Sequence, residues 1–173
     1  RRAVELARSR LGLDRCGILL EHDGVLCATY GTNLRGETTD ERAHRQPITP
    51  EWRARYRRRE APETPWTETP GPLWEWTGRD MVRLERQGVI ATTPIQTAER
   101  FIGVFCNDNG IRGAPLEPAR QEVLAVFCSL LGNIIERMLG PGSMTNGVMT
   151  PDFYNSLGAM HGTIMIFLGI VPI

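Results

Sequence analysis

The longest helical pattern in the chain covers residues 118–138, and it constrains the fold more than any other segment. Pro118 stands near its start, where the missing N–H of a proline costs no hydrogen bond. Apolar residues then recur with the period of one helix face, at Val123, Phe127, Leu130, Ile134 and Met138. The stripe is widened by Leu124, Leu131 and Ile135. A stripe of this width predicts a helix that covers a sheet and still meets a partner helix.

The preceding segments predict the sheet that this helix would cover. Residues 3–13 have the apolar spacing of a short amphipathic entry helix. In residues 15–31, two apolar runs flank a His-Asp-Gly turn in which Gly24 can adopt positive φ, so a β-hairpin is expected. Residues 88–95 and 101–109 predict a second pair of strands. The sheet should therefore contain at least four strands.

Between these strand pairs, the sequence is polar and rich in turn residues. Thr38 and Glu41 have the spacing of a helix capping box. Residues 49–60 predict a short helix with Thr49 as its N-cap and its arginines on a solvated face. Residues 61–80 contain four prolines and three tryptophans, which predicts an irregular loop packed down as a lid.

Composition excludes several classes of function. Lys and Arg number 20 and Asp and Glu number 20, so no net charge selects nucleic acid, and no nucleic-acid contact is expected. The four cysteines lack CxxC spacing and have apolar neighbours, which favours buried, reduced thiols in a cytoplasmic domain rather than metal ligands. No Ser-His-Asp context, GxSxG motif, P-loop or zinc spacing is visible. Catalytic residues are therefore not expected in residues 1–138.

The order helix, hairpin, irregular insertion, two strands and long closing helix resembles the GAF domain, a sensory module. The likeness covers about residues 1–138 and is carried by "CGILLEHDGVLCATYGT" and "TTPIQTAERFIGVFCNDNGIRGAPLEPARQEVLAVFCSLLGNIIER". It implies an α+β fold, with an antiparallel sheet flanked by helices and a ligand pocket formed by the insertion. GAF modules bind cyclic nucleotides, bilins, haem or small metabolites. The Asn-Lys-Phe-Asp-Glu signature of cyclic-nucleotide binders and an evident bilin-attachment cysteine are both missing.

Small-molecule pockets are concave and mostly apolar, with a few polar groups that orient the ligand. The candidate pocket walls are Tyr30, Trp66, Trp74 and Trp76. In the alternative interpretation, the tryptophans only fix an irregular loop to the sheet. His22 and His44 are expected at the surface. The expected partners are an unknown small ligand and a second copy of the chain, bound through the terminal helices, and a ligand-free dimerisation scaffold is the open alternative.

The composition changes at Gly140. Residues 140–151 are turn-rich, and from residue 157 to 173 only His161 and Thr163 interrupt a run of apolar or small residues. The length of this run does not decide whether the segment spans a membrane, because about 20 residues are needed to cross a bilayer. The segment "NGVMTPDFYNSLGAMHGTIMIFLGIVPI" resembles the approach to, and the start of, the second transmembrane helix of haem-copper (cytochrome c) oxidase subunit I. That resemblance implies that His161 is an axial haem ligand and that the segment is a membrane segment.

The sequence thus predicts three parts: a GAF-like sensory domain over residues 1–139, a linker over 140–151, and a truncated hydrophobic helix over 152–173. The main hypothesis is a non-catalytic sensory or regulatory domain of a signalling or transcription-regulating protein. The alternative is a fragment of oxidase subunit I, too short to be active, in which haem is a cofactor only if the tail belongs to an oxidase. No other metal site is expected. Joining two such parts indicates a chimeric sequence, either mis-joined, engineered or a natural fusion.

Overall fold

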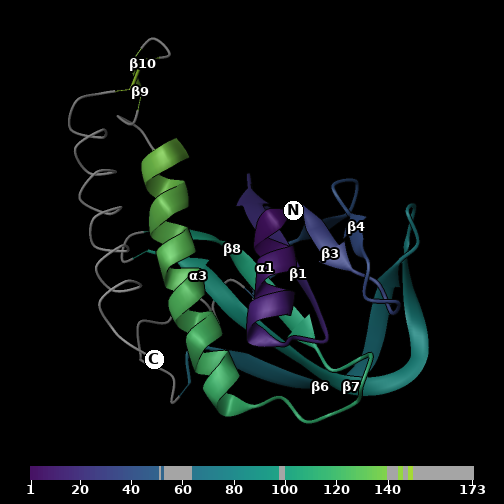
Figure 1. Ribbon diagram of the computed structural model, residues 1–173. Helices are drawn as coiled ribbons and strands as arrows, with labels where there is room; N and C mark the ends of the chain where they lie inside the picture. Colours follow the sequence, from purple (N-terminus) through teal and green to yellow (C-terminus); the bar gives the residue numbers. More distant parts are fainter. Residues whose placement is uncertain (51, 53–63, 98–99, 140–143, 146–147, 150–173) are drawn as a thin grey trace. The chain divides into compact units, whose positions relative to one another are not determined.

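The computed structural model describes residues 1–50, 52, 64–97, 100–139, 144–145 and 148–149 (Figure 1). The chain divides into two compact units, Arg1–Asn133 and Ile134–Ile173. The elements of the first unit are α1 (Arg2–Leu11), β1 (Arg15–His22), β2 (Val25–Ala28), β3 (Tyr30–Thr32), β4 (Thr38–Asp40), β5 (Arg45–Pro47), β6 (Thr67–Trp76), β7 (Met81–Gln96), β8 (Phe101–Asp108) and α3 (Pro118–Leu139), which runs on into the second unit. The second unit also contains β9 (Met144–Thr145) and β10 (Val148–Met149), which pair antiparallel.

The main sheet has six antiparallel strands in the order β5-β2-β1-β8-β7-β6, and β3 and β4 form a separate pair. The predicted hairpin is confirmed as β1 and β2, and its turn residues Asp23 and Gly24 have φ values of 51° and 81°. Positive φ at both turn residues matches the right-handed twist of the flanking strands, which explains why the Asp-Gly pair was informative. The predicted pair of strands at residues 88–95 and 101–109 is confirmed as β7 and β8, although β7 begins earlier, at Met81.

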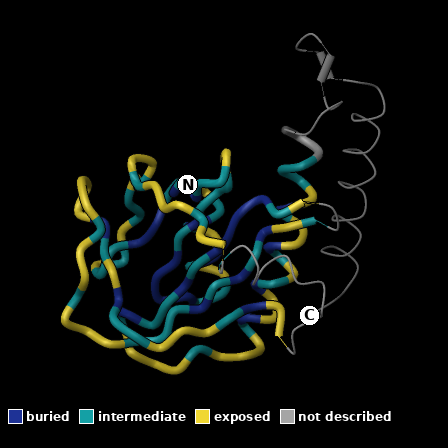
Figure 2. Tube along the Cα trace, turned by 180° about the vertical axis from the view of Figure 1, so that it is seen from behind, coloured by how far each residue is buried: buried dark blue, intermediate teal, exposed yellow. Residues whose placement is uncertain are grey.

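Side chains alternate between the two faces of the sheet, and α1 and α3 lie on the same face (Figure 1). Phe105 of β8 is fully buried on this face, and its ring meets Phe127 of α3 edge-on at 6.3 Å between centroids. From α1, the Val4 carbonyl accepts a bond from the thiol of Cys16. Figure 2 shows that the buried segments run through the middle of the unit, whereas the outer hairpins are exposed. The α+β fold with helices flanking an antiparallel sheet is therefore confirmed.

The long helix is confirmed as α3. Some of its apolar residues are buried, whereas others are exposed. Leu124 and Cys128 are fully buried. Val123, Val126 and Leu130 are instead 53%, 62% and 55% exposed. The buried positions cover the sheet, and the exposed positions form an outward apolar row, which we call the α3 outer face.

The prediction that residues 61–80 form an irregular loop was wrong, because Thr67–Trp76 form the strand β6. This strand lies at the edge of the sheet, where a proline can be accommodated without breaking a ladder on both sides. Pro70 and Pro72 accordingly face Val89 and Gln87 of β7, and the register shifts between Pro72 and Trp74.

The capping box expected at Thr38 and Glu41 was also wrong, because residues 38–40 form strand β4. Pairing with β3 gives this backbone its hydrogen bonds, so no helix begins there. The N-cap predicted at Thr49 does form a capping bond, with the amide of Trp52 donating to Thr49 Oγ1 at 3.2 Å. The remainder of the helix predicted over residues 49–60 lies outside the described residues.

Most of the predicted linker and all of the predicted hydrophobic helix, including His161, lie outside the described residues. Of the helices that the structure does describe, neither combines the length and the apolar character needed to cross a membrane. The boundaries at residues 139 and 151 therefore stay predictions.

Candidate ligand-binding site

A cavity of about 520 Å³ lies on the face of the sheet opposite α1 and α3. Its floor comes from alternate positions of three neighbouring strands, because residues two apart in a strand share a face. The floor residues are Arg15, Gly17 and Leu19 of β1, Val104, Cys106 and Asp108 of β8, and Ile90 and Thr92 of β7. The strand register places Arg15 opposite Asp108, Gly17 opposite Cys106 and Leu19 opposite Val104. The floor is thus polar at one end and apolar at the other.

Aromatic side chains form much of the wall. Trp74 and Trp76 of β6 line the cavity, as do Trp52 and His44. The rings of His44 and Trp76 are 5.7 Å apart and tilted by 49°. Trp76 is 8% exposed, whereas Trp74 is 42% exposed and lies at the rim. The wall therefore offers flat surfaces to a ligand, both deep in the cavity and at its mouth.

A glycine in β3 gives the Glu41 carboxyl group its place in the cavity wall. A methyl group at Gly31 of β3 would lie 2.1 Å from Glu41 Oε1, so only glycine leaves room for this side chain. Gly17 lies beneath, and a methyl group there would be 3.6 Å from the Gly31 Cα and 4.0 Å from Glu41 Oε2. Thr39 Oγ1 donates to Glu41 Oε1 at 2.9 Å and fixes the carboxyl group in place.

The polar end of the cavity is organised around Arg15, which is 6% exposed. Its Nη2 donates to the Trp74 carbonyl oxygen, and its Nε lies 3.6 Å from Asp108 Oδ2. Its Nε and Nη1 are both enclosed, with almost no accessible surface, and neither has a hydrogen-bond partner within the described part of the chain. Asp108 Oδ1 accepts a bond from the Gly110 amide at 2.8 Å. The polar end therefore contains one buried cation, which is held by the Trp74 carbonyl oxygen and by Asp108.

Burial changes the protonation of several cavity groups. It raises the pKa of Asp108 against the opposing effects of the Arg15 charge and the Gly110 hydrogen bond. It also raises the pKa of Glu41, opposed by the Thr39 hydrogen bond and the Arg15 charge. Burial, followed by the nearby Arg45 charge, lowers the pKa of His44. The imidazole is therefore neutral near pH 7.

The cavity thiols are poor nucleophiles. Burial raises the pKa of Cys106 to about 11 and that of Cys16 to about 12, so neither is a thiolate near neutral pH. Among the residues that the structure describes, no group of three or more His, Cys, Asp or Glu side chains could hold a metal ion. The arrangement is thus suited to holding a ligand by shape, stacking and hydrogen bonds.

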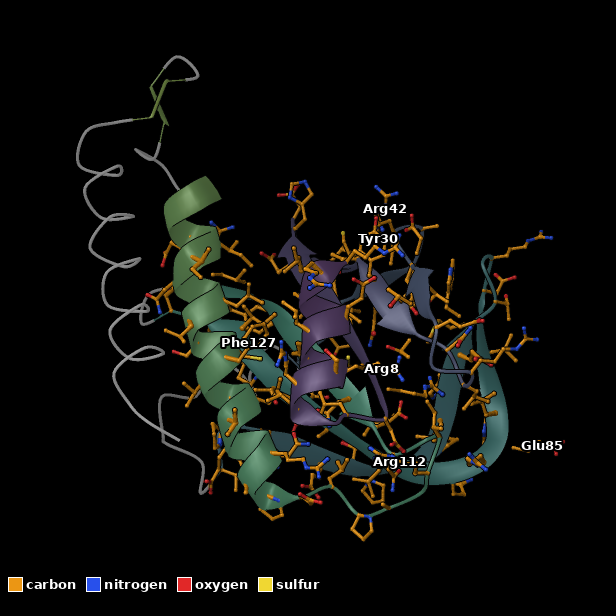
Figure 3. The ribbon with its side chains drawn as sticks, in the orientation of Figure 1. Arg8, Tyr30, Arg42, Glu85, Arg112 and Phe127 are labelled. Carbon is orange, nitrogen blue, oxygen red and sulfur yellow. The ribbon has the colours of Figure 1, made fainter. Side chains whose placement is uncertain are left out.

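The structure brings two of the four predicted pocket residues to the cavity, namely Trp74 and Trp76. Tyr30 and Trp66 do not line it. Figure 3 shows Tyr30 beside Arg42, whose guanidinium carbon lies 5.6 Å from the centre of the tyrosine ring. Trp66 is buried, and its indole N–H donates to Glu68 Oε1 at 3.0 Å. A role for any of these residues in ligand binding stays a prediction.

Sequence reasoning missed the polar end of the site. Arg15 and Asp108 come from opposite ends of the domain, and the pairing of β1 with β8 brings them together. The available signal for this end of the site was Arg15 and Gly17, which occupy alternate positions of β1. Such residues indicate that this face of the strand is not part of the packed core. His44 was expected at the surface but is half-buried against Trp76, and His22 is exposed as expected.

No protein-family model matches the sequence, and no curated protein matches it. Among solved structures, it is similar to the second GAF domain of DevS from Mycobacterium smegmatis, with 15% identity, a TM-score of 0.53, and coverage of 84% of this chain and 96% of that one. It is also similar to the GAF domain/HD domain protein from Geobacter sulfurreducens, with 11% identity, a TM-score of 0.55, and coverage of 81% and 91%. A third similar structure is the phycocyanobilin-bound GAF domain from a cyanobacterial phytochrome, with 14% identity, a TM-score of 0.53, and coverage of 81% and 84%. The oxidase resemblance of residues 140–173 stays a prediction, whereas the first unit has the GAF fold that its sequence predicted.

Proposed function

We propose that this chain is a non-catalytic sensory or regulatory domain of a signalling or transcription-regulating protein, and that it binds a small, flat ligand in the cavity. The observation that carries the proposal is a cavity with an aromatic wall and a polar end lined by Arg15, Glu41 and Asp108. A cavity of about 520 Å³ has the size of known small-molecule sites.

The GAF fold supports the proposal, since one of the similar solved structures is described as phycocyanobilin-bound. In this chain, the walls favour a flat ligand because Trp74, Trp76 and His44 present ring faces or edges. We place the domain in the cytoplasm because its sequence pattern favours reduced thiols, and all four cysteines are free.

Titration with Prodan, a neutral naphthalene dye, tests whether the cavity admits a flat ligand. We expect saturable binding in which tryptophan emission falls and dye emission shifts to the blue. Trp74→Ala should weaken binding, because it removes a rim wall. Trp66→Phe is the matched control, because Trp66 does not line the cavity and should leave binding unchanged. Absence of saturable binding, or equal binding by the Trp74 variant, would overturn the proposal.

A second function, homodimerisation, is favoured by the α3 outer face. Val123, Val126 and Leu130 are each more than half exposed and follow one another at helical spacing. A second copy of the chain suits such a row, because a two-fold interface requires a self-complementary surface. Analytical ultracentrifugation should show a dimer that dissociates in Val126→Glu and persists in Val82→Glu, the same change at an exposed valine of β7. A wild-type monomer at high concentration would contradict this function.

The oxidase alternative rests on the sequence resemblance of about residues 140–173, with His161 as haem ligand. If it holds, the chain is chimeric and contains a membrane segment. Full-length chain mixed with haem should then develop a sharp Soret band that disappears in His161→Ala and persists in the exposed-histidine control His22→Ala. A band unaffected by His161→Ala would refute haem ligation. One long DNA read across codons 120–173 decides whether the two parts are joined in the source.

A further inference from the structure

We propose that the cavity selects a flat organic cation, such as an aromatic ring with a permanently charged nitrogen, over uncharged and anionic rings of the same shape. This inference rests on the proposed ligand-binding function, because it names the charge of the ligand for the same cavity. It stands on the excess of acidic groups in the cavity lining, on the open oxygen of Glu41 and on the aromatic wall.

The charged residues of the lining do not balance. Of the described residues that line the cavity, Arg15 is positively charged, whereas Glu41 and Asp108 are both acids. Arg15 is already paired, because its Nε lies 3.6 Å from Asp108 Oδ2. His44 adds no charge near pH 7, because burial, followed by the Arg45 charge, lowers its pKa. The charge of Glu41 is therefore left without an equal positive charge in the described lining.

The Glu41 carboxyl group keeps one oxygen open. Its Oε1 accepts a bond from Thr39 Oγ1 at 2.9 Å. Its Oε2 accepts no hydrogen bond from a described residue, yet it is not among the enclosed polar atoms of those residues, so it retains accessible surface. Within the described part of the chain, no cationic side chain lies at ion-pair distance from either oxygen, and Arg15 acts on the group only through its charge. A ligand can therefore supply the contacting cation.

The protonation of Glu41 supports this interpretation. Burial raises the pKa of its carboxyl group, although the Thr39 hydrogen bond and the Arg15 charge oppose the increase. Burial acts on Asp14 in the same direction, but hydrogen bonds and charge from the contacting Arg112 outweigh it and lower the pKa. A half-buried carboxylate without a contacting cation is thus disfavoured relative to one that has such a partner. A bound cation would stabilise the ionised form of Glu41.

The aromatic wall suits the same charge. The amide of His44 donates to the Glu41 carbonyl oxygen at 2.8 Å, so both residues belong to one turn. The His44 ring in turn lies 5.7 Å from that of the buried Trp76, and Trp52 and Trp74 also line the cavity. The faces of tryptophan rings carry partial negative charge and attract cations, most strongly where water is excluded. Both the carboxylate and the rings therefore favour a flat cation.

Three probes that share one ring system test the charge preference on the full-length chain: N-methylquinolinium, 4-methylquinoline and quinoline-4-carboxylate. Near pH 8 they are a cation, a neutral molecule and an anion, and the first two have equal numbers of non-hydrogen atoms. Isothermal titration calorimetry should show the tightest binding for the cation and the weakest for the anion. A positive charge beside a half-buried carboxylate and tryptophan rings should bind roughly 10- to 100-fold tighter than its neutral counterpart.

Glu41→Gln locates the charge that the ligand meets. The amide oxygen can still accept the Thr39 bond, whereas the negative charge is lost. The affinity for N-methylquinolinium should fall roughly 10-fold or more, and that for 4-methylquinoline should stay unchanged. Glu85→Gln is the matched control, because it removes the same charge from an exposed position on β7 that does not line the cavity (Figure 3). Far-UV circular dichroism checks that each variant is folded, and the probe series on the unchanged chain decides the charge preference independently.

The outcomes separate this inference from the proposed function. Equal or tighter binding of 4-methylquinoline or of quinoline-4-carboxylate than of the cation would overturn the inference and leave a ligand-binding domain of another specificity. Saturable Prodan binding without binding of any quinoline probe would have the same meaning. A cation preference that is retained in Glu41→Gln would overturn the role of this carboxylate. If neither Prodan nor the probes bind, both the inference and the proposed function fail.

Discussion

Replacing Arg15 by methionine tests whether the buried ion pair supports the domain. The side chains of Arg15 and Asp108 are 8% and 14% exposed, so loss of the guanidinium leaves a buried carboxylate without its cation. Breaking a buried pair on one side typically costs about 3–5 kcal/mol, out of about 5–15 kcal/mol for a whole domain. We expect Arg15→Met to lower the free energy of unfolding near pH 7 by about that amount, measured by urea denaturation with circular dichroism.

The destabilisation should depend on pH in a defined direction. Burial already raises the pKa of Asp108, and removing the Arg15 charge takes away an opposing effect, so this pKa should rise further. A carboxyl group whose folded pKa exceeds its unfolded value supports stability below the unfolded pKa, and this support is lost as the pH rises through the folded pKa. The deficit of Arg15→Met should therefore shrink as the pH falls from about 7 toward about 4.

A double-mutant cycle with Asp108→Asn separates charge pairing from packing. The double variant should be less destabilised than the sum of the single variants, with a coupling energy of about 0.5–3 kcal/mol. Arg83→Met is the control, because Arg83 is exposed on β7 and its loss should change stability little. Additive single effects combined with a pH-independent deficit would refute the reasoning, because they would mean that Arg15 acts only through packing and its bond to the Trp74 carbonyl.

Three other predictions concern groups that the proposed ligand site does not use. Leu124→Ala should lower the free energy of unfolding by about 2–5 kcal/mol in urea titrations, because this side chain is fully buried against the sheet. Burial would raise the pKa of Asp14, but hydrogen bonds and charge from Arg112 outweigh it and hold this pKa below its ordinary value. Stability from Asp14 is thus present above its unfolded pKa and lost below about pH 4, and thermal melts of Asp14→Asn should lack that part of the acid sensitivity. Burial raises the pKa of Cys16 and Cys128 to about 12, so Ellman's reagent should label both thiols only on unfolding.

The parts of the fold that could be predicted from sequence are those fixed by local chemistry. The Asp23-Gly24 turn and the helical spacing of α3 each depend on a few neighbouring residues. β6 could not be predicted in this way, because Pro70 and Pro72 normally exclude a strand. They are tolerated because β6 lies at the edge of the sheet, and an edge position is a property of the whole sheet.

The same distinction holds for the candidate site. Trp74 and Trp76 were expected in a pocket because large aromatic side chains in a proline-rich segment need a surface to cover. Arg15, Asp108 and Glu41 gave no comparable signal, because an isolated charged residue in a sequence is usually solvated. Their meeting depends on the β1–β8 register and on the space that Gly31 leaves free. Such long-range placement requires the folded structure.

Both outer strands of the main sheet contain proline, with Pro47 in β5 and Pro70 and Pro72 in β6. A proline has no N–H to donate, so a strand from another molecule cannot form an uninterrupted ladder along either border. The sheet is therefore protected against lateral growth into a continuous intermolecular sheet, the geometry from which fibrous aggregates develop. Variants that replace these prolines would lose that protection while leaving the interior of the domain unchanged.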